Sequence, residues 1–250
     1  MGIEIFNTED QASGNFNYGE ILENKPIGFP QDSGKLKPYS SLFYWAHAWT
    51  PGKKSTIGLH PHKGFEICSF VLKGKINHFD TKQNKWISLE EGDVQIIRSG
   101  NGISHAEELE SKSEIFQIWF DPDLSKTLKK EASYDDYKSK DFKIIKTSNK
   151  LKKIILGDGS PMKMDTEGIL INEYEFDIGL HKHEILKNSF HSIFIIGGTI
   201  KLNQKVLRCG TFLKLGDIDE FDFHSLEKTK LFEIISPRHI SYNTYVQTLA

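Results

Sequence analysis

The feature that most constrains the fold of this chain is a short motif that occurs twice. Residues 70–76 read FVLKGKI and residues 194–200 read FIIGGTI, an offset of 124 residues. The same offset carries Gly92-Asp93 onto Gly216-Asp217. One matching heptapeptide would mean little, but two matches at the same offset indicate an internal duplication. The sequence therefore predicts two similar domains in tandem.

Both copies of the duplicated region read as short strands separated by turns. The expected strands are rich in β-branched and aromatic residues and are bounded by Gly, Asn or Asp. Helical signals are few, and a helix beginning at Asp123 or Ser125 and ending at Lys130 is marginal. We therefore expect an all-β protein of two tandem barrels. The expected strands are 67–72, 75–79, 86–89, 94–97 and 115–120 in the first copy and 168–176, 192–196, 199–202, 211–215 and 231–235 in the second.

A turn-rich segment between the two copies suggests the domain boundaries. Asp121-Pro122-Asp123 opens a stretch rich in Lys and Asp that reads as a connection. A chain of 250 residues is long enough for two domains of ordinary size. We expect a first domain over residues 1–122, a connection over 123–142 and a second domain over 143–250.

Composition argues against several classes of function. With 32 basic and 34 acidic residues the net charge is −2, so a direct nucleic-acid ligand is not expected. The sequence contains no run of about 18 apolar residues that could span a membrane. Residues 1–10 lack the basic start and apolar stretch of a secretory signal. Cys68 and Cys209 are too few for a disulfide framework or a thiolate cluster. The expected location is the cytoplasm.

His60-Pro61-His62 is the motif that carries the most chemistry. Residues i and i+2 of a strand point to the same face, so both imidazoles can enter one barrel interior and share one ion. Pro61 has no N–H and therefore requires an edge strand or an irregular position. A lone His-x-His more often lies on the surface or in a core, so a metal site needs further ligands nearby.

A second pair of polar side chains with the same spacing, His105 and Glu107, follows the turn-rich segment 99–102. Three imidazoles and one carboxylate suit iron, nickel, copper, manganese or zinc and do not suit calcium or magnesium. The spacing leaves the carboxylate ligand open between Glu66 and Glu107, and the other carboxylate could act as a base or support a ligand. His78 is expected to be structural or to line the pocket.

The second copy of the repeat does not carry this ligand set in register. His181 and His183 could be brought into line by a three-residue shift, with His224 as a distant third ligand. We expect these histidines to be exposed and the second barrel to be a degenerate copy without a metal. The offset of 124 residues pairs His60 with Glu184, His62 with Leu186, His105 with Thr229 and Glu107 with Leu231.

Several of these segments together resemble the pirin family of bicupins. They are residues 60–66 (HPHKGFE), 92–95 (GDVQ) and 100–107 (GNGISHAE). The resemblance is dense over residues 55–122 and weaker in the second half. It implies that the barrels are jelly rolls, also described as double-stranded β-helices.

The resemblance also implies one metal site, in the first barrel. It places the ligands on His60, His62, His105 and Glu107, whereas general cupin spacing would select Glu66. The implied metal is iron(II), with manganese, nickel, copper or zinc as alternatives.

Two functions follow from the resemblance. The first is a flavonol (quercetin) 2,3-dioxygenase, in which the substrate would chelate the metal and Glu107 would accept the proton of the 3-hydroxyl group. The second is a non-catalytic, iron-dependent redox sensor that binds a protein partner, for which the sequence shows no motif. An apolar pocket could be supplied by aromatic side chains, although core packing is expected for most of them. These side chains are Phe65, Phe70, Phe79 and Phe116.

Overall fold

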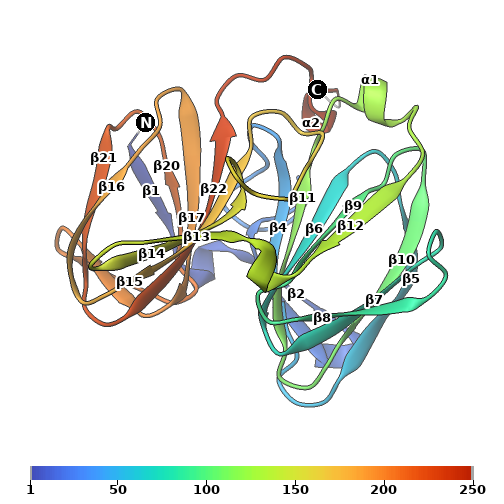
Figure 1. Ribbon diagram of the computed structural model, residues 1–250, viewed down its shortest axis with the longest axis horizontal. Helices are drawn as coiled ribbons and strands as arrows, with labels where there is room; N and C mark the ends of the chain where they lie inside the picture. The colour runs from blue at the N-terminus through green and yellow to red at the C-terminus, as the bar shows by residue number, and fades with distance from the viewer. Residues whose placement is uncertain (1, 249–250) are drawn as a thin grey trace. The chain divides into compact units, whose positions relative to one another are not determined.

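The computed structural model describes residues 2–248 and is built almost entirely of β-strands (Figure 1). Within these residues the strands form four antiparallel sheets, two with seven strands and two with four. The chain divides into two compact units, and each unit contains one sheet of each size. The expected all-β architecture of two tandem barrels is confirmed.

The first barrel comprises residues 10–140, 164–167 and 241–248. Its larger sheet has the order β12-β9-β6-β11-β4-β3-β2 and its smaller sheet the order β5-β10-β7-β8. The strands of the larger sheet are β2 (Ala12–Phe16), β3 (Ile21–Ile27), β4 (Leu42–Trp49), β6 (Glu66–Lys73), β9 (Val94–Arg98), β11 (Glu114–Phe120) and β12 (Ser133–Tyr137). Those of the smaller sheet are β5 (Ser55–His62), β7 (Lys75–Asp80), β8 (Trp86–Glu90) and β10 (Ile103–Leu109).

The second barrel comprises residues 2–9, 141–163 and 168–240. Its larger sheet has the order β1-β20-β17-β22-β15-β14-β13 and its smaller sheet the order β16-β21-β18-β19. The larger sheet contains β1 (Ile3–Phe6), β13 (Lys143–Lys146), β14 (Lys150–Leu156), β15 (Leu170–Phe176), β17 (Ser189–Gly197), β20 (Phe212–Leu215) and β22 (Thr229–Pro237). The smaller contains β16 (Gly179–Glu184), β18 (Thr199–Leu202), β19 (Lys205–Arg208) and β21 (Glu220–Ser225).

The helical elements are short and lie outside the sheets. The marginal helix expected near residue 125 is present as α1, where Asp123 accepts the main-chain N–H of Ser125 at 3.1 Å, but it ends at Thr127. No helix within residues 2–248 is long and apolar enough to cross a membrane. The helices are η1 (Thr8–Asp10), η2 (Asn17–Gly19), α1 (Leu124–Thr127), η3 (Ser139–Asp141) and α2 (Tyr245–Thr248).

Alternation along the strands places one face of each sheet in a core, because successive side chains of a strand point to opposite sides. In the first barrel the aliphatic core joins both sheets through Ile21, Val71, Ile76, Leu89, Leu109 and Ile115. In the second barrel the core includes Phe176, Ile193, Ile195, Leu213, Phe221, Phe223 and Leu231. Phe70 and Phe116 are 2% and 0% exposed, so these two aromatic residues serve packing, as expected.

The duplicated motif forms the same hairpin in both barrels. Its glycines, Gly74 and Gly198, join β6 to β7 and β17 to β18 with φ values of +75° and +82°. A Cβ at Gly198 would lie 2.5 Å from the carbonyl oxygen of Lys228. Both the left-handed backbone and the close approach require glycine, which explains why this residue recurs in the repeat.

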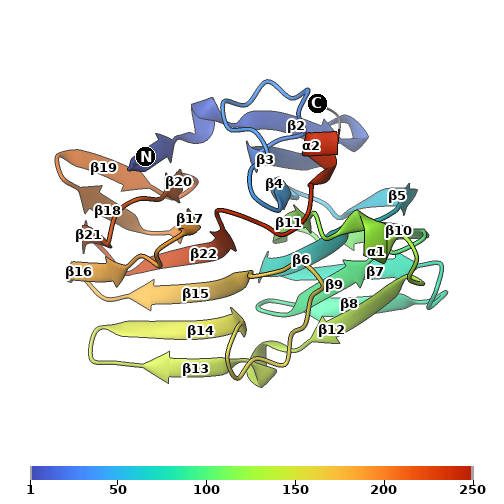
Figure 2. The same ribbon diagram turned by 90° about the horizontal axis from the view of Figure 1, so that it is seen from above.

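The two compact units do not coincide with the expected boundaries. Residues 2–9 group with the second barrel because β1 pairs with β20 (Figure 2). Part of the expected connection, residues 123–142, contains β12, which completes the first barrel by pairing with β9. Sheet edges are thus completed by segments remote in sequence. The stretches that can fold independently stay a prediction.

Candidate metal centre

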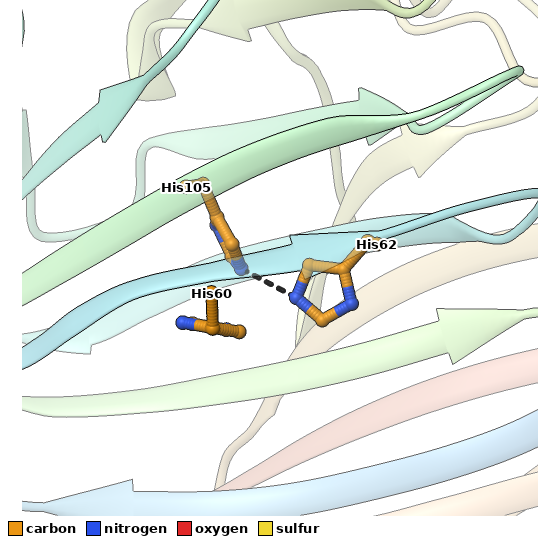
Figure 3. Close-up of side chains that lie close together, drawn as sticks. All are labelled: His60, His62 and His105. Atoms are coloured by element: carbon orange, nitrogen blue, oxygen red, sulfur yellow. Dashed lines mark hydrogen bonds between the residues drawn. The ribbon is translucent and has the colours of Figure 1, made fainter.

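The structure brings His60, His62 and His105 together at one point of the first barrel (Figure 3). The ring centroids are 4.7 Å apart for His60 and His62, 4.5 Å for His60 and His105, and 4.6 Å for His62 and His105. Antiparallel pairing of β5 with β10 sets His105 opposite His60, and alternation along β5 turns His62 to the same face. One ring nitrogen from each histidine lies within 4.8 Å of the others.

Burial favours neutral, ligand-competent imidazoles. Desolvation, reinforced by His105 and His60, lowers the pKa of His62 to about 3, with Glu107 acting in the opposite sense. Desolvation, together with His60 and His78, lowers the pKa of His105 to about 2. Metal binding requires an unprotonated ring nitrogen. At neutral pH, His62 and His105 therefore each have a nitrogen lone pair that can bind a metal ion.

The local backbone explains how the sequence reaches this arrangement. β5 is an edge strand of its sheet, which is where Pro61, lacking an N–H, can be accommodated. The turn before β10 contains Gly100 with φ +49°, where a Cβ would lie 2.6 Å from the carbonyl oxygen of Lys130. A glycine is therefore needed at the point where the chain enters the strand that carries His105.

Glu107 lies beside His105 but is not part of the three-histidine group. Its ligand atom lies within 4.8 Å of those of His105 and His78. One carboxylate oxygen accepts the hydroxyl of Ser69 at 2.9 Å, and the other accepts the amide of Gln117. To reach the ion, the carboxylate would have to turn away from these donors. Glu107 as the fourth ligand stays a prediction.

Glu66 has a different set of partners. It is 1% exposed, and its oxygens accept the main-chain N–H groups of Asp165 and Thr166, each at 2.7 Å. The Thr166 hydroxyl adds a third hydrogen bond at 2.6 Å, and Arg98 Nε lies 3.6 Å away. Among residues 2–248, Glu66 belongs to none of the groups that could hold a metal ion. Its position fits a role in anchoring residues 164–167 to the first barrel.

A histidine–aspartate pair behind His105 is a feature that sequence reasoning missed in part. His78 Nε2 lies 3.1 Å from Asp80 Oδ2, and both residues are fully buried. The ring centroids of His78 and His105 are 5.5 Å apart. The sequence predicts that His78 is structural or lines the pocket, whereas Asp80 is not among the predicted site residues. The signal was present, because the two side chains have the same i, i+2 spacing as the histidines of β5.

An aromatic wall borders His62. The Trp119 ring meets His62 edge to face with centroids 4.8 Å apart, and its Nε1 donates to Gln117 Oε1 at 3.1 Å. Phe65, one of the aromatic residues expected near the pocket, lies 5.9 Å from Trp119, centroid to centroid. Phe79 instead packs against Trp86 at 5.6 Å. The wall consists of Phe29, Phe43, Tyr44, Phe65, Trp119 and Tyr245.

An open pocket of about 520 Å³ also touches His62. Pro61 and Ser104 alternate with the histidines along β5 and β10, so they face the opposite side of the sheet. His62 and Ile103 also line the pocket and lie on the same face as His105, so the pocket is lined from both faces of the sheet, where β5 ends and β10 begins. Its lining residues are Pro61, His62, Lys63, Thr81, Gly102, Ile103 and Ser104.

The second barrel keeps a His-x-His pair but has no histidine opposite it in the position of His105. His181 and His183 are 8% and 6% exposed, so the expectation that they are exposed was wrong. Both point into the barrel, because alternation along β16 turns them to its inner face. Phe223 stands opposite His181 in the register, where His105 stands opposite His60 in the first barrel. His224, on the alternate face of β21, is only partly buried.

Comparison with known proteins shows the same domain and fold. Residues 25–120 match the family model described as Pirin. A quercetin 2,3-dioxygenase of Escherichia coli strain K12 is 41% identical over 70 residues, covering 27% of this chain and 30% of that protein. Pirin-1 of Arabidopsis thaliana is 29% identical over 174 residues, covering 67% of this chain and 58% of that protein. Both alignments thus span less than two thirds of the relative.

Solved structures extend the likeness to both barrels. The bacterial pirin YhhW of Escherichia coli, solved in complex with nickel(II), superposes with a TM-score of 0.78 at 20% identity, covering 95% of this chain and all of that one (100%). A mutant of Bacillus subtilis oxalate decarboxylase OxdC gives a TM-score of 0.65 at 12% identity, covering 98% of this chain and 80% of that one. At these identities the structures show a shared two-barrel fold. The Pirin family match covers residues 25–120, the segment that carries the three histidines, so the first barrel of this chain is similar to the pirin family.

Proposed function

We propose that this chain holds one divalent transition metal, iron(II), on His60, His62 and His105, with Glu107 as the fourth ligand. We further propose that it oxidises a small aromatic substrate of the flavonol class. The observation that carries the proposal is the convergence of three imidazoles beside an aromatic wall, with burial lowering the pKa of His62 and of His105. The relatives and structural neighbours that are quercetin dioxygenases or hold nickel(II) support it.

The donor set suits such an ion. Imidazole nitrogens and a carboxylate oxygen are ligands of iron, nickel, copper, manganese and zinc. A bound ferrous ion would supply a Lewis acid for the substrate oxygens and a partner for dioxygen. His105 Nε2 lies 2.8 Å from His62 Nε2, a hydrogen bond that a shared ion would replace, and His105 Nδ1 is buried without a hydrogen-bond partner within residues 2–248.

The side chains around the site would bind the substrate and accept its proton. Trp119 and Phe65 would bind the flat rings of a flavonol, because offset and edge-on aromatic contacts favour such a surface. Glu107 would accept the proton of the 3-hydroxyl group, and Gln117 and Ser69 would hold the carboxylate for that transfer. General-base assistance of this kind contributes roughly 10²–10⁴-fold to a rate.

The decisive experiment loads the full chain anaerobically with iron(II), adds quercetin and oxygen, and measures oxygen uptake together with release of carbon monoxide. His105→Ala is the inactive control, and His47→Ala, a histidine of the same barrel paired with Glu114, is the matched one. Metal-dependent carbon monoxide that survives in His47→Ala and disappears in His105→Ala is the expected result. Stoichiometric metal in His105→Ala would show that the ligand assignment is wrong.

One observation favours a second function, a non-catalytic redox sensor that binds a protein partner. The open pocket of about 520 Å³ that touches His62 is also lined by Pro61 and Ser104, which face the outside of the barrel. A partner could contact this face and respond to a change at the metal through His62. Firmly bound iron without turnover of quercetin, combined with partner binding that differs between ferrous and ferric protein, would support the sensor over the enzyme.

A further inference from the structure

The second barrel contains a buried carboxylate surrounded by hydrogen-bond donors. Glu233 on β22 is 1% exposed, and its Oε1 lies 2.7 Å from both His183 Nε2 and His191 Nδ1. Its Oε2 accepts the Tyr174 hydroxyl at 2.9 Å and the Asn172 amide at 3.5 Å. Burial would raise the pKa of Glu233, but His183 and His191 outweigh it and hold that pKa well below its usual range. Glu233 is therefore a fixed anion with all its lone pairs engaged.

The composition of this cluster resembles a metal site, but its hydrogen bonds do not. The main-chain N–H of Leu186 donates to His191 Nε2 at 2.8 Å. His191 must therefore carry its proton on Nδ1, the atom that faces Glu233. A metal at that point would displace the proton to Nε2, where it would oppose the N–H of Leu186. The backbone thus fixes the cluster as a hydrogen-bonded network.

A cavity of about 480 Å³ borders this network. Its walls include the alternate residues of β14 and of β15, which are neighbours in the larger sheet (Figure 2). The buried polar side chains that line it are Asn172, Tyr174, His183, His191 and Glu233.

Two lysines in the cavity lack an acidic partner. The Nζ atoms of Lys150 and Lys152 lie 5.9 Å and 5.7 Å from the centre of the Tyr174 ring. Neither forms an ion pair within the described chain, whereas Lys182 of the same cavity pairs with Glu220 at 2.5 Å. Burial lowers the pKa of Lys152, so its charge is partly desolvated. These two ammonium groups would gain from a counter-charge supplied by a ligand.

The other walls set the shape of that ligand. Leu156, Leu170, Leu186 and Ile235 offer an apolar surface beside the lysines. Glu233 at the buried wall would repel a second carboxylate from the deepest part of the cavity. Asp158 and Glu184 also line the cavity, but both are exposed to solvent. An anionic head next to the lysines and an apolar body fit these constraints.

We propose that the second barrel binds a small organic carboxylate in this cavity, with the carboxylate between Lys150 and Lys152 and an apolar body against Leu170 and Leu186. Charge-assisted hydrogen bonds fix the head group, and the Tyr174 ring holds the ammonium groups in place. The site needs no metal and is independent of the function proposed for the first barrel.

The test titrates the isotopically labelled full chain with benzoate and with octanoate and follows the backbone amide chemical shifts. Benzyl alcohol is the uncharged probe, and inorganic phosphate is the probe without an apolar body. We expect saturable shifts in β14, β15 and β16, with the two carboxylates binding at least about tenfold more tightly than the other probes. The Lys150→Gln/Lys152→Gln variant should lose about tenfold in carboxylate affinity. Lys146→Gln, the same charge change on exposed β13, should lose none.

Other outcomes would overturn the proposal. Benzyl alcohol binding as tightly as benzoate would reveal a merely apolar pocket, and phosphate binding as tightly would reveal an unspecific cationic one. Equal weakening in Lys146→Gln would trace the effect to net charge. A cobalt(II) titration that broadens the His191 ring signals with saturation would show a metal site. If circular dichroism shows that the double variant does not fold, the single variant Lys150→Gln, at a half-exposed position, is compared with Lys146→Gln instead.

Discussion

The buried pair of His78 and Asp80 lies beside His105, with the ring centroids of His78 and His105 5.5 Å apart. Asp80 Oδ1 accepts the main-chain N–H groups of Lys82 and Gln83 at 2.8 Å and 2.7 Å, which fixes the carboxylate. His78 therefore donates from Nε2 to Asp80 and keeps a lone pair on Nδ1. Within residues 2–248, the Nδ1 atoms of His78 and His105 are both buried without a partner. His78 is thus suited to accept the second ring proton of His105, which would orient that ligand.

This arrangement predicts the effect of Asp80→Asn. The amide oxygen can keep the two main-chain hydrogen bonds, while its NH₂ group faces His78 and moves the ring proton to Nδ1. Metal affinity should then fall by about 10–100-fold, the usual effect of losing such support. Competition with a chelator measures it. Asp93→Asn is the matched control, since Asp93 makes similar main-chain hydrogen bonds remote from the histidines. Unchanged affinity in Asp80→Asn, or equal loss in the control, would contradict the support role.

The two candidate carboxylates should respond differently to amide substitution. Glu66→Gln should lower the free energy of unfolding by about 1–3 kcal/mol, because charged hydrogen bonds to Thr166 and Asp165 are weakened. Its metal content should stay unchanged. Glu107→Gln should lower metal affinity and turnover. Urea unfolding and metal analysis of both variants test the assignment of Glu107 as the fourth ligand. Loss of the metal in Glu66→Gln and its retention in Glu107→Gln would show that this assignment is wrong.

Residue spacing could predict part of the site. The i, i+2 rule placed His60 and His62 on one face, because alternation is a local property of any strand. The choice between Glu66 and Glu107 depends on what else contacts each carboxylate. Glu66 is engaged by Thr166, which lies 100 residues away along the chain. No local pattern records such a contact.

At the scale of elements, the hairpin at the end of β17 offers a matched pair of glycines. Gly198 has φ +82° and a Cβ there would lie 2.5 Å from the carbonyl oxygen of Lys228, whereas a Cβ at Gly197 would meet only Lys230 Cβ at 4.0 Å. Gly198→Ala should cost about 1–3 kcal/mol of unfolding free energy, and Gly197→Ala much less. Denaturant unfolding of both variants tests this, and equal stabilities would refute the strain argument.

The segment ending in α2 depends on Asp121. Its carboxylate accepts the N–H of Tyr245, and its carbonyl oxygen accepts the Tyr242 hydroxyl at 2.7 Å. Burial raises the pKa of Asp121 from 3.8 to about 6, against the lowering effect of the Tyr245 hydrogen bond. Between these values the folded chain retains a proton that the unfolded chain has released. This contribution to stability is therefore present below pH 3.8 and is lost as the pH rises through about 6.

Asp121→Asn should remove this pH dependence. The amide resembles the protonated acid, so the variant should be more stable than the parent above a pH of about 6, with the difference shrinking toward a pH of about 4. Denaturation midpoints across this range measure it. Asp123→Asn is a control of opposite sign, because the neighbouring Lys126 lowers the pKa of Asp123. A stability difference that grows toward acid pH in Asp121→Asn would contradict the argument.

Strands inside each barrel could be predicted from the pattern of residue types, but the strands that complete the edges of the sheets could not. The motif at residues 70–76 recurs at 194–200 as a hairpin because its turn requires glycine locally. β1 and β12 complete their sheets by pairing with strands far away in the sequence, β20 and β9. Short edge strands carry little periodicity of their own, so only the folded structure shows where they belong.

At the scale of the whole molecule, the duplicated barrels have diverged in their interiors. The first sets His60 opposite His105, whereas the second sets His181 opposite Phe223. Phe223 is 2% exposed and packs in the core of the second barrel, so its ring fills the space that an imidazole and an ion would need. One barrel can thus serve metal chemistry while the other is free to bind a different ligand.

This divergence predicts one metal per chain. Native mass spectrometry after loading with iron(II) or nickel(II) should show a single ion, and His60→Ala should abolish it. His183→Ala should leave the metal content unchanged, but it removes one of the two histidine hydrogen bonds of the buried Glu233 carboxylate and should lower the unfolding free energy by about 1–3 kcal/mol. Two ions per chain, with one lost in His183→Ala, would show that the hydrogen-bonded network around Glu233 rearranges to bind metal. A single ion lost in His183→Ala and kept in His60→Ala would move the metal centre to the second barrel.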